Sequence, residues 1–198
     1  MTVKEKSKPR GRPRAFDREA ALDRAQALFH AQGYEGVGVA ALAEAMGVNP
    51  PSLYAAFGSK AQLFEEVLDR YARAALPVDA LLHDGAPPAA ALAALLREAA
   101  YIYTQDPQAP GCLVLEGARG ADPDAALHAR VWREASAARV RAFIAATHPA
   151  DADVVADYMV SIMSGLSADA RAGHARARLV AVAEMAALAI EAMLDRAD

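Results

Sequence analysis

The spacing of apolar residues is helical along most of this chain, and this spacing most constrains its fold. From residue 17 onward, apolar positions recur every three or four residues in segments that end at glycine or proline, and no segment alternates with the period of two typical of a strand. Much of the apolar content is alanine and only 6% of the residues are aromatic, which favours closely packed helices. The sequence predicts an all-α protein of about nine helices.

Local signals place the ends of these helices. Asn49 and Ser59 are good N-cap residues, Pro50 suits a first helical position because its missing N–H leaves no donor unpaired, and Gly33 and Gly47 end the preceding segments. The expected helices span about 17–32, 39–46, 50–57, 60–76, 87–105, 111–119, 123–147, 152–172 and 175–197.

Charge and cysteine content narrow the class of protein. The net charge is −4, yet residues 1–60 carry nine Lys and Arg against six Asp and Glu. An acidic body with a basic end is typical of a protein that binds phosphate groups at one end.

Cys112 is the only cysteine, so no intramolecular disulfide can form and a reducing cytoplasm is the expected location. No segment has the pattern of a signal peptide or is apolar enough to cross a membrane, so no membrane partner is expected.

Two short expected helices, 39–46 and 50–57, are joined by a tight turn inside a three-helix unit, which is the pattern of a helix-turn-helix. Ala43 is small enough for the two helices to cross closely, and Gly47 can adopt a positive φ in the turn. Val48 and Leu53 are placed to seal the junction. The sequence therefore predicts a DNA-binding unit near the N-terminus.

The pieces ALFHAQGYEG, LAEAMGV, SLYAAFGSK and LFEEVL follow one another over residues 16–71. In order and spacing they resemble the TetR family of repressors, and GCLVLEGA (111–118) and GLSADARAG (165–173) look like a subgroup with a GCL motif at the start of the sixth helix. The resemblance implies a basic disordered arm over 1–15, a helix-turn-helix DNA-binding domain over 16–60, and a helical ligand-binding and dimerisation domain over 61–198. It implies a homodimeric repressor that binds double-stranded palindromic operator DNA and is released by a small-molecule effector.

The resemblance also implies which residues contact DNA. The helix over 50–57 would lie in the major groove, with Asn49, Pro51 and Ser52 near bases or backbone. Tyr54 would donate its hydroxyl to one phosphate, and Lys60 would clamp another. A lone tyrosine more often packs in a core, and this remains the alternative for Tyr54.

The chain departs from the family just before the second helix. Val37 and Gly38 stand where two hydroxyl residues are usual, so no side chain contacts a phosphate there. The basic arm can compensate, because Arg10, Arg12 and Arg14 are separated by glycine and proline, much as in an AT-hook that enters an A·T-rich minor groove. A solvated charge run is the alternative.

The last two helices each have a broad apolar stripe, and two such helices per subunit could pack as a four-helix bundle, so the resemblance to the family implies that they form the homodimer interface. The alternative is that both stripes face the core of one chain. The two stripes contain Val154, Val155, Tyr158, Met159, Ile162, Met163 and Leu166, and Leu179, Val182, Ala183, Ala186, Ile190 and Met193.

The helices over 87–147 are expected to enclose an effector pocket, although every candidate lining residue also fits plain core packing. Cys112 follows Pro110 and Gly111 at an expected helix N-terminus, where the helix dipole lowers the pKa of a thiol, so it is a candidate sensor of electrophiles. The alternative is a small buried residue. The candidates are Tyr101, Tyr103, Cys112, Trp132, Met159 and Met163.

Other classes of function find little support in the sequence. The five histidines are scattered, and neither an HExxH pattern nor a glycine-rich phosphate loop is present. We therefore expect no enzyme activity, no cofactor and no metal site. A scaffold protein with a vestigial helix-turn-helix is the other alternative, and the basic arm, Tyr54 and Lys60 argue against it.

Overall fold

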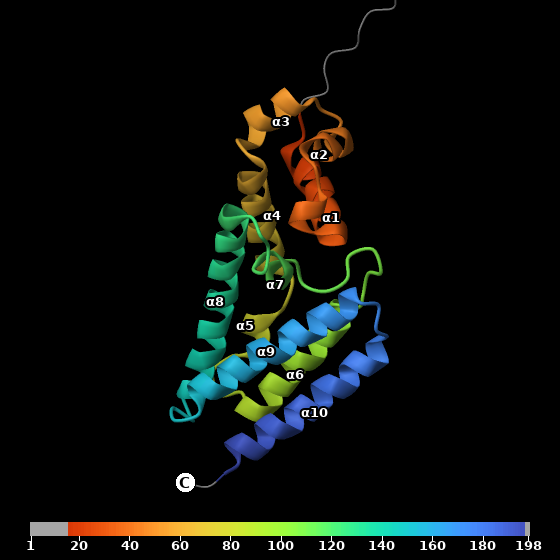
Figure 1. Cartoon of the computed structure of the whole chain (residues 1–198). Coiled ribbons are helices and arrows are strands. Elements are labelled where there is room, and N and C mark those ends of the chain that lie inside the picture. Colours follow the sequence, from red (N-terminus) through yellow and green to blue (C-terminus); the bar gives the residue numbers. More distant parts are fainter. Residues whose placement is uncertain (1–15, 197–198) are drawn as a thin grey trace, which may run out of the picture.

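The computed structural model describes residues 16–196, which contain ten helices and no strand, as predicted for an all-α protein (Figure 1). The additional helix is α5, a single turn of four residues that the apolar spacing did not indicate. No helix in this part of the chain combines the length and apolarity needed to cross a bilayer. The helices are α1 (Arg18–Gly36), α2 (Val39–Met46), α3 (Pro50–Phe57), α4 (Lys60–Ala74), α5 (Val78–Leu81), α6 (Pro88–Ile102), α7 (Leu113–Gly117), α8 (Pro123–Ala145), α9 (Ala152–Arg171) and α10 (Arg176–Leu194).

The expected caps form the turns around α3. The side chain of Asn49 accepts a hydrogen bond of 2.8 Å from the Ser52 N–H, and the Ser59 hydroxyl accepts one of 3.1 Å from the Gln62 N–H. Gly47 ends α2 with φ 69°, in the left-handed region that residues with a Cβ rarely adopt. These local contacts place α2 and α3 as a helix-turn-helix.

Several helix ends differ from the expectation, two of them at glycines. Gly33 has φ 74° and interrupts α1 as predicted, but one more turn follows and ends at Gly36. Helix α7 starts at Leu113 rather than residue 111, because Gly111 has φ 78°. A Cβ at Gly111 would lie 2.8 Å from the Ser167 carbonyl oxygen, so the close approach of this segment to α9 requires glycine.

Helix α4 joins the N-terminal unit to the body. In Figure 1, α3 lies at one end of the molecule and α6, α9 and α10 lie at the other, with α4 running between them. Its buried side chains face α1, α7 and α8, all of which pack against α4. These side chains are Leu63, Phe64, Val67, Leu68 and Tyr71.

Helix α10 packs mainly along α6, so most of its predicted dimer stripe belongs to the core of one chain. An ion pair of 2.6 Å between Arg97 and Glu184 ties the same two helices together at the surface. The stripe residues buried within the chain are Val155, Met159 and Leu166 on α9, and Leu179, Ala183, Ala186 and Ile190 on α10. Among the stripe residues, Val154 and Val182 are exposed.

A small polar cluster connects α1 to the loop before α7. The buried His30 Nε2 lies 3.2 Å from the Gly111 carbonyl oxygen. From α9, Arg171 donates to the carbonyl oxygens of His30 (3.0 Å) and Pro110 (3.2 Å). Burial lowers the pKa of His30 and nearby Arg171 lowers it further, while the Gly111 contact and Asp106 act in the opposite direction.

The neutral state of His30 predicts a loss of stability in acid. Since its pKa in the folded chain is lowered, the unfolded chain binds a proton more readily, and the free energy of unfolding should fall as pH drops below about 6.5. Urea unfolding of the wild type and of His30→Gln between pH 7.5 and 5.5 measures this. The variant keeps a donor toward Gly111 and should lose less stability over this range. Equal losses in the two proteins would contradict the prediction.

Candidate nucleic-acid interface

Helix α3 presents a polar and an apolar side. Leu53 and Phe57 are buried, and the ring of Phe57 packs edge-on against Phe16 with centroids 5.9 Å apart. Tyr54 is exposed over 47% of its surface, so it is not a core residue. Asn49, Pro51 and Ser52 are exposed as well, and the predicted contact residues of this helix therefore lie on its outer side at the end of the molecule.

The position of α3 is held by contacts that α1 makes with α3 itself and with α4. Arg18 of α1 lies 4.9 Å from the centroid of the Phe57 ring and forms an ion pair of 2.6 Å with Glu66 of α4. Arg70 of α4 pairs with Asp23 of α1 at 2.6 Å. All three contacts join residues that lie far apart in the sequence, and no sequence pattern indicated them.

Lys60 lies differently from the expectation. Its ammonium is 4.0 Å from the centroid of the Tyr34 ring, and the Tyr34 hydroxyl donates to Asp122 at 3.3 Å. Glu35 accepts a 2.7 Å hydrogen bond from the Ala121 N–H. Burial lowers the pKa of Lys60, although the Glu35 and Asp122 carboxylates act in the opposite direction. In this structure Lys60 therefore contacts α1, at the place where α1 meets the start of α8.

The three arginines predicted to contact a groove, Arg10, Arg12 and Arg14, lie outside the described residues. Helix α3 itself has no charged side chain. Arg24, on α1, donates to the Ala45 carbonyl oxygen at 3.1 Å and thereby connects α1 to α2.

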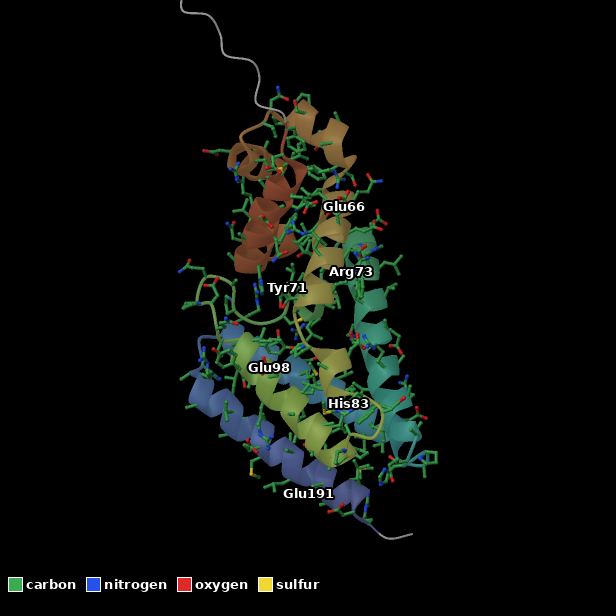
Figure 2. All side chains as sticks on the ribbon, turned by 180° about the vertical axis from the view of Figure 1, so that it is seen from behind. Glu66, Tyr71, Arg73, His83, Glu98 and Glu191 are labelled. Carbon is green, nitrogen blue, oxygen red and sulfur yellow. The ribbon has the colours of Figure 1, made fainter. Side chains whose placement is uncertain are left out.

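A cavity of about 100 Å³ lies between α4, α6, α7, α8 and α9. Four of the predicted effector residues line it together: Tyr103, Cys112, Met159 and Met163. Tyr71 also lines it, near the lower end of α4 (Figure 2). Tyr71 was not among the predicted effector residues, although it stands four residues after the buried Val67 and therefore continues the inward face of α4.

Two other predicted effector residues, Tyr101 and Trp132, do not line this cavity. Tyr101 is exposed over 46% of its surface, and the Arg176 guanidinium lies 4.3 Å from the centroid of its ring. The Trp132 indole N–H donates to an Asp69 carboxylate oxygen at 2.8 Å, and this contact joins α8 to α4. Helical spacing placed both aromatics on the inner helices but did not indicate which face of each helix meets the cavity.

The expected lowering of the Cys112 thiol pKa is wrong. Cys112 is buried at the start of the five-residue helix α7, and its burial raises the pKa of the thiol even though neighbouring hydrogen bonds oppose this. Its N–H donates to the Ser167 hydroxyl at 2.8 Å. Residues 16–196 contain no group of three or more His, Cys, Asp or Glu side chains that could hold a metal ion.

Residues 21–67 match the family model described as bacterial regulatory proteins, tetR family. The transcriptional repressor BdcR of Escherichia coli (strain K12) is 44% identical over 196 residues, which cover 98% of this chain and 100% of BdcR. The repressor ComR of the same strain is 35% identical over 188 residues, covering 89% of this chain and 90% of ComR.

A solved structure shows the same fold with DNA bound. It is a cysteine mutant of the TetR-family regulator CifR in complex with a 26-base-pair operator duplex. It is 39% identical, has a TM-score of 0.75, and matches 90% of this chain and 99% of its own. With a helix-turn-helix at one end, a helical body at the other and relatives that match over nearly their whole length, the chain belongs to the TetR family of bacterial transcriptional regulators.

Proposed function

We propose that this protein is a homodimeric repressor that binds a palindromic operator through α2 and α3 and leaves it when a small molecule enters the body cavity. The observation that carries the proposal is the outward presentation of α3, with Asn49, Ser52 and Tyr54 exposed on a helix anchored from behind. The names of BdcR and ComR as repressors and the operator complex of CifR support it.

Helix α4 is the proposed link between effector and DNA. Its N-terminal residue, Lys60, follows α3 after two residues, whereas Tyr71, Ala72 and Ala75 at its other end line the cavity. A ligand that prefers a shifted α4 would change the separation of the two α3 helices, which must match half-sites about 34–36 Å apart. Coupling of this kind is typically about 1–3 kcal/mol, or about five- to 150-fold in affinity.

Replacement of Tyr54 by phenylalanine tests the DNA contact. The change removes only the hydroxyl, and a hydrogen bond to a charged phosphate contributes about 1.5–3 kcal/mol, so operator affinity should fall about tenfold or more. Fluorescence anisotropy with a duplex found by footprinting beside the protein's own gene measures the effect.

Tyr101→Phe is the matched control, because Tyr101 is equally exposed (46%) but lies in the body on α6. Its operator affinity should equal that of the wild type. If both variants bind as the wild type does, Tyr54 makes no phosphate contact. If the wild type shows no salt-dependent binding to any duplex from this region, the proposed repressor function fails and the scaffold alternative gains support.

The dimer interface is proposed on the exposed face of α10. Met185 and Leu188 are exposed over 68% and 60% of their surfaces, and Val182 on the same face is also exposed. On neighbouring α9, Val154 is exposed over 52%. Large exposed apolar side chains on one face of a helix are typical of an interface, and the resemblance to the family assigns this interface to a second copy of the chain.

The double variant Met185→Glu/Leu188→Glu should convert the dimer into a monomer of 20.8 kDa, because two carboxylates per subunit would lose their hydration in the interface. Sedimentation velocity or light scattering measures the mass. The control is Leu127→Glu/Val131→Glu on α8, where the wild-type side chains are similarly exposed (61% and 57%). A control that dissociates while the α10 variant stays dimeric would place the interface elsewhere.

The remaining expectations belong to the same proposal. The arginines of the basic arm would add contacts in a neighbouring minor groove, and the role requires a cytoplasmic location because it requires access to DNA. Membership of a subgroup with the GCL motif is part of the same proposal, and the close approach of Gly111 to α9 and the hydrogen bond from the Cys112 N–H to Ser167 support it.

A further inference from the structure

Lys60 occupies a position where its ammonium needs negative charge nearby. It is the first residue of α4, and the aligned backbone dipoles of a helix place partial positive charge at the helix N-terminus. A lysine in a first turn is therefore unfavourable unless an anion compensates it. Since α4 begins only two residues after the end of α3, either the protein itself or a DNA phosphate beside α3 can supply this anion.

The protein supplies negative charge to Lys60 where α1 meets the start of α8. The Lys60 ammonium lies 4.0 Å from the centroid of the Tyr34 ring, and the negative face of an aromatic ring attracts a cation. The carboxylates of Glu35 and Asp122 attract the same ammonium. We call Tyr34, Glu35 and Asp122 together the Lys60 site.

Hydrogen bonds fix the members of the Lys60 site relative to one another. The Tyr34 hydroxyl donates to an Asp122 carboxylate oxygen at 3.3 Å. Glu35 accepts from the N–H groups of Ala121 at 2.7 Å and of Asp122 at 3.4 Å. The Asp122 side chain also caps α8. The site is therefore organised by contacts of its own and joins the DNA-binding unit to the body.

The hold on Lys60 is weak enough to be reversible. Lys60 is half-buried and Glu35 is exposed, so solvent screens the attraction between them. The lysine side chain is a flexible four-carbon stem, and it can turn toward a phosphate beside α3 without a movement of the backbone. One ammonium cannot occupy both places at once.

We propose that the Lys60 site competes with operator DNA for the Lys60 ammonium. Tyr34, Glu35 and Asp122 hold the ammonium in the free protein, and a backbone phosphate takes it in the complex. The contribution of Lys60 to operator affinity is then the difference between its two sets of partners. The three residues are positioning residues that lower this affinity through Lys60. The inference rests on the proposed function, because it describes how one contact of the proposed DNA complex forms.

Neutral replacements of the two carboxylates test the competition. Glu35→Gln keeps an acceptor for the Ala121 N–H, and Asp122→Asn keeps a good helix cap. The double variant should bind the operator about three- to tenfold more tightly than the wild type, the range expected for the loss of two weak, partly exposed charge pairs. Fluorescence anisotropy measures the affinity.

Lys60→Met separates this effect from a general loss of negative charge. In a Lys60→Met background, Glu35→Gln/Asp122→Asn should leave operator affinity unchanged within about twofold. A gain of equal size with and without Lys60 would overturn the proposal, because the carboxylates would then act on DNA directly. Glu44→Gln is the matched control: this exposed carboxylate of α2 does not act on Lys60, so its effect should be the same in both backgrounds.

NMR of the full chain observes the contact itself. The chain has only four lysines, Lys4, Lys6, Lys8 and Lys60, so lysine labelled with carbon-13 gives few signals, and the signal that Lys60→Met removes is assigned to Lys60. An aromatic ring shifts protons above its face upfield. The Cε protons of Lys60 should be shifted upfield in the free protein, less so in Glu35→Gln/Asp122→Asn, and not in the operator complex. An unshifted signal in the free protein would contradict the proposal.

The inference and the proposed function can be told apart when either fails. A wild type that binds the operator while the Lys60 signal stays shifted contradicts the competition and leaves the repressor function standing. A wild type that binds no duplex contradicts the proposed function, and the competition for Lys60 then fails with it.

Discussion

The packing of Phe64 between α1 and α7 is the contact on which the rest of the structure depends. Its ring centroid lies 5.0 Å from that of Phe29 and 5.0 Å from that of Tyr34, both on α1. On its other side, a Cβ at Gly117 would lie only 3.0 Å from the Phe64 ring. Because a close-packed interior does not absorb displacements locally, a movement of α4 must also move α1 or α7.

The helices and their caps were predictable because they depend on neighbouring residues. Asn49 and Ser59 cap the helices expected from their side chains, and Gly47 takes the backbone conformation expected for the turn. The Lys60–Tyr34 contact was not predictable, since it joins the start of α4 to the end of α1. The role of Tyr71 was missed because a cavity is formed by several helices whose relative rotation is not encoded in any one of them.

Apolar periodicity identified the buried faces of helices but not their partners. On α10 the inward residues Ala183 and Ile190 pack within the chain, whereas Met185 and Leu188 project outward, and both sets obey the same helical spacing. Cys112 shows a second limit, because a helix N-terminus and burial shift the pKa of a thiol in opposite directions. Burial prevails at this short helix, and the sequence contained no measure of that burial.

The proline pair at the start of α3 changes what that helix can offer to an anion. Helix N-termini usually bind phosphate through free backbone N–H groups, but Pro50 and Pro51 have none and the Ser52 N–H is already bonded to Asn49. The first turn of α3 therefore has no free backbone N–H group to donate to a phosphate. Its preference for one duplex over another must come from the shape and chemistry of the groove rather than from charge.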